Sequence, residues 1–477
     1  MDPLFADPTI VVAPDPPRPP ADGPADWLRR NLFRSVGDTI VTVVAAVIVG
    51  YIVFRLGRFV LVSGRWTIVR RNLALFMVGR YPRDELWRVG TAVCVIAGYG
   101  GVLAGYVNRR QVEAGRAPTG MSLARRLADV VVRMWPLLVG VIVLLALTRT
   151  AGPSLLALLV VASAVAGRLI GPLLGRRWLV ALVLIGIVVP IVLVWLLTRP
   201  FGWDEWGGMM LNFFLAAAGI GLSFPLGVLL ALGRRAGGST DSPTAGAVIA
   251  VLFAAPVVVI LLRRELAVDS VVTWGLVVLL VAFATYGYQL GRRATLPLVR
   301  VVSVAYIEFF RGVPLYVLLG LGYLGLRFFL PSGSDPPGLV VRAIIVFTLF
   351  TAAYIAEIVR GGLQSLPKGQ TEAAQALGLS PVRTTGLIVL PQALRNVIPA
   401  IVGQFISLFK DTTLAGAAIG FLELLNVADA ATAQEAFQGQ RVFAEALTFV
   451  MFVFWVGCIT MSRESQRLER KLGVGTR

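Results

Sequence analysis

Charged residues interrupt long apolar stretches in the C-terminal half of this sequence, and their chemistry is that of ion pairs and of contacts with a charged cargo. Each such side chain is costly in hydrocarbon and is expected to face a bundle interior or a cavity. They mark a candidate path through a membrane, in which Glu308 would pair with an ammonium group. The candidate path also includes residues at the neighbouring helix breaks, which are Gly312, Pro314 and Thr412. Together the path residues are Glu308, Arg311, Gly312, Pro314, Glu357, Lys410, Asp411 and Thr412.

Two of these groups have a simpler interpretation as structural ion pairs. Glu308 and Arg311 are three positions apart, and Glu357 and Arg360 have the same spacing. Side chains at this spacing are neighbours on a helix. Contact with cargo and structural pairing therefore both stay open for each pair.

The tetrapeptide "KDTT" at 410–413 interrupts another apolar run. We expect Lys410 and Asp411 to neutralise each other in part. Asp411 or Thr412 would cap a helix that restarts over 413–425, leaving a half-helix N-terminus at membrane depth. Such a terminus could attract a carboxylate, although a satisfied helix break explains the pattern equally well.

Absent residues exclude several enzyme classes. The chain has no histidine, which removes the usual general base and the Ser-His and Cys-His nucleophile pairs. No G-x-x-x-x-G-K-[ST] loop occurs, and "GLGYLG" at 320–325 lies in an apolar run instead of after a strand. Both cysteines lie in apolar runs. We expect no enzyme activity, no metal and no cofactor on this chain, so any use of ATP requires a partner.

Composition places the chain in a membrane. Hydrophobic residues make up 57% of the 477 residues, charged residues only 15%, and the mean hydropathy is +0.80. The formal charge of +18 comes from arginine clusters between apolar runs, which is typical of loops facing a bilayer. The sequence predicts an all-α polytopic membrane protein whose partner is lipid and not nucleic acid.

About twelve membrane helices are predicted from windows near 20 residues. The polar, basic C-terminus is expected to be cytoplasmic. Successive loops alternate between the two sides of the membrane, and counting back from the C-terminus places most arginine clusters on the cytoplasmic side. The stretch 55–88 does not fit, because it holds eight arginines on the predicted outer side; it is either an interfacial amphipathic segment or a sign of a miscounted helix. The predicted segments are 36–54, 89–107, 130–148, 154–174, 178–198, 208–232, 245–262, 271–290, 313–330, 341–360, 395–425 (broken) and 443–461.

Three regions follow from these patterns. Residues 1–35 form a Pro-rich disordered tail with an interfacial start, 36–200 a membrane extension of about five helices, and 201–477 the part with the chemistry-like features. In the extension, glycines four apart predict close helix contact. These glycines are Gly101 and Gly105 on one helix, and Gly167, Gly171 and Gly175 on another.

A small, polar stretch lies between two of the most apolar segments, "PKGQTEAAQALGLSPVRTTGLIVLP" at 367–391. Thr371 is a possible N-cap of a first short helix, and Gly378 is placed to end it. Ser380 followed by Pro381 would start a second short helix over 382–390. Pro391 and Pro399 would then bend the chain back into the membrane.

The result would be a rigid helix–turn–helix projection suited to a groove of a partner protein, or else a solvated loop with helical propensity. The spacing resembles the EAA motif of permease subunits of binding-protein-dependent ABC importers. Residues 207–477 resemble the polar amino-acid uptake branch, with "YIEFFRGVPL" at 306–315 and "QFISLFKDTTL" at 404–414. "WLRRNLF" at 27–33 and "VGRYPRDELWR" at 78–88 resemble the M-type permease of general L-amino-acid transport systems.

The resemblance implies a type I permease core without enzyme activity. The EAA loop would dock into a cytoplasmic ABC ATPase dimer that binds the ATP. The implied docking residues are Gly369, Gln370, Glu372, Ala373, Ala374, Gly378, Ile388, Leu390 and Pro391. An external amino-acid-binding protein and a second permease, related or identical, would complete a multi-pass assembly in the bacterial inner membrane.

The sequence departs from the family by two apparent extra helices within 236–296 and a further addition within 130–174. Two other classes stay open. An ion-coupled secondary transporter would use the acidic residues at depth as coupling sites, but it leaves the EAA spacing unexplained. A membrane sensor or scaffold would have no transport path.

Overall fold

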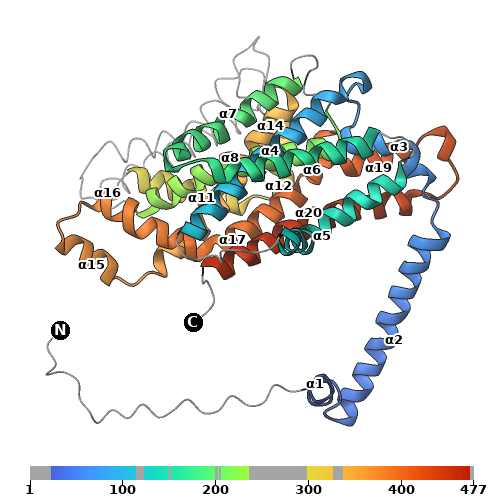
Figure 1. The fold of residues 1–477 in the computed structure, drawn as a ribbon, viewed down its shortest axis with the longest axis horizontal. Helices are drawn as coiled ribbons and strands as arrows, with labels where there is room; N and C mark the ends of the chain where they lie inside the picture. The colour runs from blue at the N-terminus through green and yellow to red at the C-terminus, as the bar shows by residue number, and fades with distance from the viewer. Residues whose placement is uncertain are drawn as a thin grey trace, which may run out of the picture. The chain divides into compact units, whose positions relative to one another are not determined.

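The computed structural model describes residues 23–113, 123–148, 152–198, 202, 206–235, 298–325 and 337–472. The regular structure of these ranges is helical, which confirms the predicted fold class (Figure 1). The chain divides into two compact units, Met1–Arg65 and Trp66–Arg477.

The first unit contains α1 (Pro24–Asn31), α2 (Val36–Arg58) and a π-helical turn, η2 (Phe59–Ser63). Ser35 caps α2 by accepting a hydrogen bond from the backbone N–H of Asp38 at 3.1 Å. α2 and η2 form a candidate membrane span of 28 residues, longer than the predicted 36–54, and no residue of α2 is buried. An apolar helix open on all sides suits a lipid environment. Of the predicted tail, residues 1–22 lie outside the described residues.

The second unit contains the other helices, and short 3₁₀ or π-helical turns extend several of them. Before residue 200 they are α3 (Thr67–Val78), α4 (Leu86–Glu113), α5 (Leu123–Leu147), α6 (Gly152–Ile170) and α7 (Leu179–Thr198). After it they are α8 (Gly208–Arg235), α11 (Leu298–Gly312), α12 (Leu315–Gly320), η7 (Leu321–Gly325), α14 (Leu339–Gln364), α15 (Gly369–Ala376), α16 (Pro381–Thr384), η8 (Thr385–Val389), α17 (Leu390–Asp411), α18 (Thr413–Ile419), α19 (Leu424–Thr432), η9 (Glu435–Phe437) and α20 (Phe443–Leu472).

Eight helices in the described ranges are long and apolar enough to cross a membrane, and a bent pair makes a ninth. The bent pair is α11 with α12 and η7, which turn by 103° at the predicted break between Gly312 and Pro314. Within the predicted span 313–330 the structure describes α12 and η7, which are long and apolar enough for a span only together with α11 across the bend. The predicted helices 245–262 and 271–290 lie outside the described residues, so the count of twelve stays a prediction.

α3 lies in the arginine-rich stretch that did not fit the topology. It has only 12 residues, too few to cross a bilayer, and Ile68, Val69 and Phe76 are fully buried. The Phe76 ring meets Phe449 of α20 edge to face, with ring centroids 5.2 Å apart. α3 is therefore a packed core helix. On which side of the membrane residues 55–88 lie stays a prediction. The domain boundary near residue 200 also stays a prediction.

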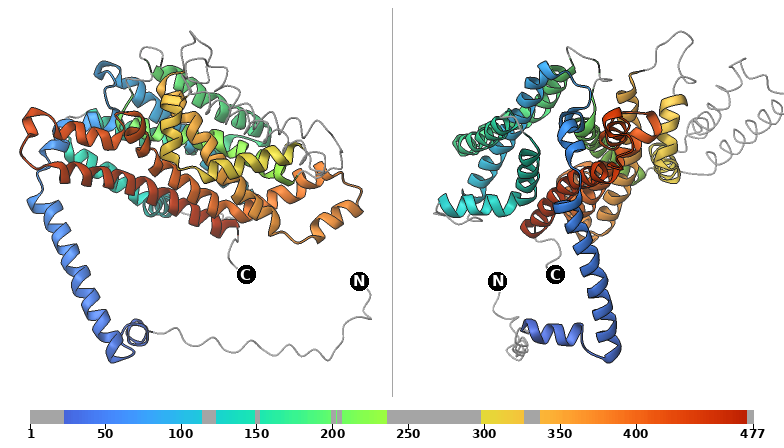
Figure 2. Two further views of the ribbon diagram at one scale, coloured as in Figure 1. Left: turned by 180° about the vertical axis from the view of Figure 1, so that it is seen from behind. Right: turned by 90° about the vertical axis from the view of Figure 1, so that its right-hand side faces the viewer.

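The glycine spacing correctly predicted close contact between α4 and α6, which run side by side (Figure 2). A Cβ atom at Gly101 would lie 2.2 Å from the carbonyl oxygen of Ala164, and one at Gly167 would lie 2.1 Å from that of Gly98. Gly175 differs from the prediction, since nothing lies within 4 Å of its Cβ position.

Replacing Gly101 with leucine should therefore force α4 and α6 apart. We expect a loss of about 3 kcal/mol or more of unfolding free energy, since backbone atoms cannot yield to a side chain. Gly100→Leu is the matched control, because nothing lies within 4 Å of a Cβ there. Thermal unfolding of the purified variants in detergent measures both changes, and equal midpoints would contradict the packing argument.

A buried apolar cluster joins α8, α11, α14 and α17. Ala231, Ile307, Ile355 and Ala393, one from each helix, are fully buried in it. Because α14 leads into α15 and α17 follows η8, this cluster fixes both ends of the segment 367–391.

Candidate functional site

The predicted helix–turn–helix exists and projects from one end of the second unit (Figures 1 and 2). α15 ends in a Schellman arrangement: the N–H of Leu379 donates to the carbonyl of Ala374 at 3.1 Å, and that of Gly378 to Gln375 at 2.9 Å. Gly378 has φ of +74°, the left-handed conformation that the motif requires. Ser380 caps α16 by accepting from the N–H of Arg383 at 3.5 Å, with Pro381 in the first turn. The predicted stop and restart are therefore confirmed.

Two details of the prediction are wrong. α15 begins at Gly369, so Thr371 lies inside the helix and is not its N-cap. The second helix does not end at residue 390, because the helical span continues from Pro381 to Asp411. The π-helical turn η8 explains why Pro391 does not break it: the N–H of Leu390 bonds to Thr385, five residues back. This wider turn leaves room for a proline ring that would clash in a regular helix.

Three large apolar side chains on this projection are open to solvent, and sequence reasoning missed them. Leu377 is 80% exposed, Val382 81% and Leu387 71%. Val382 carries the clearest signal in the sequence, because it is an apolar residue flanked by a proline and an arginine in a mostly small and polar stretch, whereas Leu387 begins the apolar run Leu387–Leu390 and has no such signal. We define Leu377, Val382 and Leu387 as the apolar tip.

The predicted docking residues divide by exposure. Ala374 is only 2% exposed and anchors α15, while Ile388 and Leu390 are half-buried. Across the projection, the side-chain amide of Gln392 donates to the Gln370 carbonyl oxygen at 3.4 Å. The exposed members are Gly369, Gln370, Glu372, Ala373, Gly378 and Pro391. The exposed residues and the apolar tip therefore lie on the same projection, whose first helix is anchored by the buried Ala374.

The charged residues near the base of α14 form one cluster instead of two local pairs. Glu357 contacts Arg360, as predicted, and also Arg234 at 3.2 Å and Arg311 at 3.9 Å. The expected pair of Glu308 and Arg311 is not formed, because Glu308 pairs with Arg234 at 3.2 Å. Arg234 was missed as a site residue, since its position at the end of a span looked like an ordinary loop charge.

The break at "KDTT" is built differently from the prediction. Lys410 is exposed, Asp411 is half-buried, and no ion pair within 4.0 Å joins these two described residues. Thr412 does not cap a helix: its hydroxyl donates to the Phe409 carbonyl at 2.7 Å and accepts from the Asn212 amide at 2.9 Å. The restarted helix α18 ends at Ile419, and not at 425, because Gly420 is left-handed.

Asn212 belongs to a buried polar group that also holds Glu423, and sequence reasoning found neither residue. The Glu423 carboxylate accepts bonds from the backbone N–H groups of Leu425 and Asn426 at 2.9 Å, and from the Asn212 amide at 3.3 Å. The Asn212 carbonyl oxygen accepts from the N–H of Leu424 at 2.9 Å. Burial raises the pKa of Glu423, while these hydrogen bonds lower it in part. Thr412 is thus held in a structural network.

Comparison with known families agrees with the predicted relationship. The family described as binding-protein-dependent transport system inner membrane component matches residues 223–474, just over half of the chain. The inner membrane amino-acid ABC transporter permease protein YhdY of Escherichia coli is 26% identical over 494 aligned positions, covering 98% of this chain and 99% of that protein. The glutamate/glutamine/aspartate/asparagine transport system permease protein BztC of Rhodobacter capsulatus is 46% identical over 183 residues, 38% of this chain and 42% of its own.

The general L-amino acid transport system permease protein AapQ of Rhizobium johnstonii is 42% identical over 123 residues, 24% of this chain and 30% of its own. Among solved structures, the crystal structure of an amino acid ABC transporter with histidines is 24% identical, has a TM-score of 0.32, and covers 54% of this chain and 94% of its own. Because the family match covers more than half of its length, this chain belongs to the binding-protein-dependent transport system inner membrane component family. With several helices long and apolar enough to cross a bilayer, it is a multi-pass inner membrane protein.

Proposed function

We propose that this chain is the permease subunit of an ATP-driven amino-acid importer, coupled to a separate ATPase through residues 367–391. The observation that supports this most directly is the apolar tip, carried on a capped projection with buried anchors. A water-exposed apolar surface of this kind is suited to burial in a partner's groove. Relatives named as amino-acid permeases support the cargo class, polar or general L-amino acids.

The proposed arrangement places this projection and the C-terminus in the cytoplasm. α20 supports it, since the helix continues beyond its apolar part into a segment with Arg463, Arg467 and Arg470. An ATPase dimer would bind and hydrolyse ATP, a second permease would supply the other half of the path, and a binding protein would deliver cargo from outside. No cofactor is assigned to this chain itself.

Reconstitution tests this function directly. The full chain is placed in liposomes with a candidate ATPase, a second permease and a binding protein, and uptake of a labelled amino-acid mixture is measured with and without ATP. Uptake that requires ATP and the binding protein supports the importer. Uptake driven by an ion gradient alone, and unaffected by Glu372→Arg, would overturn it in favour of a secondary transporter.

The proposed cargo path retains Glu308, whose side chain is 58% exposed and has one ion-pair partner among the described residues, Arg234. Arg311, Gly312 and Pro314 follow it in the chain, and Glu357 shares its partner Arg234, whereas Lys410 and Asp411 would contribute from α17. Thr412 is buried and hydrogen bonded, so its proposed role is to hold the helix break.

Glu308→Gln should lower the initial rate of uptake about tenfold while lowering the unfolding midpoint by a few degrees at most. Loss of a charged partner for the cargo ammonium costs roughly 1.5 kcal/mol. Loss of an exposed ion pair costs about 1 kcal/mol at most. Glu357→Gln is the comparison variant, because it leaves three arginines without their shared carboxylate and should lower the midpoint more. An unchanged uptake rate in Glu308→Gln would remove this residue from the path.

A further inference from the structure

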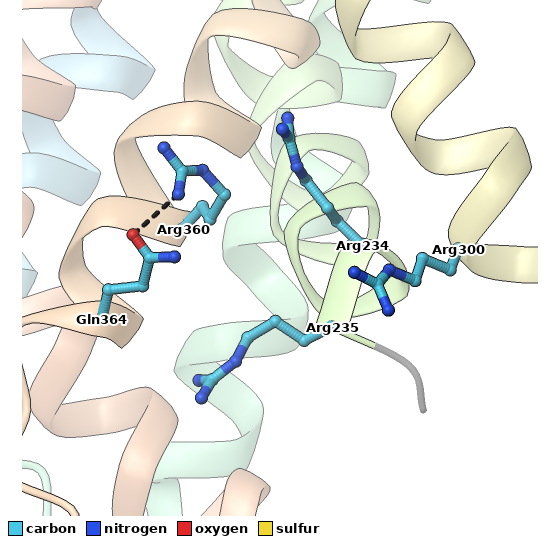
Figure 3. A pocket seen from close by; sticks show the side chains of 5 residues that line it. All are labelled: Arg234, Arg235, Arg300, Arg360 and Gln364. Atoms are coloured by element: carbon cyan, nitrogen blue, oxygen red, sulfur yellow. Dashed lines mark hydrogen bonds between the residues drawn. The ribbon is translucent and has the colours of Figure 1, made fainter. Parts of the chain in front are cut away.

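Four arginines and one glutamine line a pocket of about 350 Å³ at the ends of three helices (Figure 3). Arg234 and Arg235 end α8, Arg300 lies in the first turn of α11, and Arg360 and Gln364 lie in the last turns of α14. The Arg360 guanidinium donates to the Gln364 carbonyl oxygen at 2.7 Å. This bond orients the Gln364 amide and leaves its N–H groups available as donors.

The helix ends place this pocket at a membrane surface. Arg235 is the last residue of the candidate span Gly208–Arg235, and Gln364 is the last residue of the candidate span Leu339–Gln364. Two neighbouring spans thus end beside the same pocket, and α15 of the projection begins at Gly369, five residues after Gln364. A ligand in the pocket would lie where phospholipid headgroups lie.

The charges around the pocket do not balance. Among the described residues, five guanidinium groups, with Arg311 included, surround two carboxylates, Glu308 and Glu357, which leaves a surplus of three positive charges. The carboxylates contact Arg234, Arg311 and Arg360 only. Within the described part of the chain, no carboxylate lies within 4.0 Å of Arg235 or Arg300. Like charges held together in this way favour the binding of an anion.

We propose that this arginine pocket binds the phosphate group of an anionic phospholipid from the membrane leaflet that faces the α15–α16 projection. Arginine suits this group because its planar fork donates two parallel hydrogen bonds to phosphate oxygens. Basic pockets between membrane helices recognise lipid headgroups by this chemistry. Arg235 and Arg300 are exposed and have no carboxylate partner among the residues that the structure describes, so they are the main contacts, while Arg234 and Arg360 are held in place by Glu357.

A lipid bound here would link α8, α11 and α14 beside the segment that leads to α15. The proposal goes beyond the proposed importer function and does not rest on it, because lipid binding can be measured without ATPase, binding protein or cargo.

The test uses the full chain in nanodiscs of phosphatidylcholine, with or without phosphatidylglycerol. Its readouts are the unfolding midpoint and the lipid retained in native mass spectrometry. We expect phosphatidylglycerol to raise the midpoint of the wild-type chain. In the double variant Arg235→Gln, Arg300→Gln we expect the rise to be lost and the lipid to bind about tenfold more weakly, since two charge-assisted contacts are removed. The control Arg70→Gln, Arg395→Gln removes the same charge at exposed arginines outside the pocket.

Two outcomes overturn the proposal. If phosphatidylglycerol stabilises the pocket variant and the wild-type chain equally, the lipid acts on the general surface charge and not in the pocket. If inorganic phosphate in pure phosphatidylcholine stabilises the wild-type chain to the same extent, and phosphatidylglycerol adds nothing, the pocket takes a soluble phosphate and the lipid assignment fails. Loss of the effect in the pocket variant alone, with no response to inorganic phosphate, supports it.

Discussion

Replacing Leu377 and Val382 together with aspartate should abolish ATP-driven uptake while the permease stays folded. Both side chains are more than three-quarters exposed in this chain, at 80% and 81%, so their removal takes little from its own core. In the proposed complex they are buried in the ATPase groove. Two aspartates there would lose the apolar contacts and add two charges that burial penalises, which weakens ATPase binding by about 100-fold or more.

The measurement is co-purification of the ATPase with the permease, followed by ATP-dependent uptake in liposomes. The control Gln438→Asp, Gln440→Asp introduces two acidic residues at exposed positions after η9, outside the projection. It should retain the ATPase and transport normally. Retention of the ATPase by the Leu377, Val382 variant, at the wild-type level, would show that the apolar tip is not the docking surface.

Local chemistry explains which features of the site could be predicted from sequence. The stop at Gly378 and the start at Ser380 and Pro381 depend on residues within one turn of each other, so the sequence alone carries the signal. Pro391 was misread because a proline is a helix breaker only in a regular α-helix. The π-helical turn before it is a backbone adjustment that no single residue type announces.

Contacts between distant segments explain the errors. The expected pair of Glu308 with Arg311 assumed that the nearest opposite charge in sequence is also the nearest in space, yet Arg234 approaches from α8. Thr412 likewise bonds to Asn212, which lies 200 positions away. α11 was missed as a helix because arginine and glutamate interrupt its apolar residues, which lowers the mean hydropathy that reveals a span.

Glu423→Ala should destabilise the permease strongly. Glu423 is fully buried, and its carboxylate accepts the hydrogen bonds of two backbone N–H groups at the start of α19 and of the Asn212 amide. Alanine would leave these donors without an acceptor in the core and would remove the cap of α19. Since each buried, unsatisfied donor costs about 1–3 kcal/mol, the loss in unfolding free energy should be roughly 3 kcal/mol or more.

Thermal unfolding in detergent measures this change, with Glu435→Ala at the exposed start of η9 as the matched control, whose midpoint should stay that of the wild-type chain. A double-mutant cycle with Asn212→Ala separates the pair from general damage. If Asn212 and Glu423 act as one network, the second substitution costs much less once the first is present, because its partner is already lost. Strictly additive losses would mean that the two residues stabilise α8 and α19 independently, and that the 3.3 Å contact between them contributes nothing.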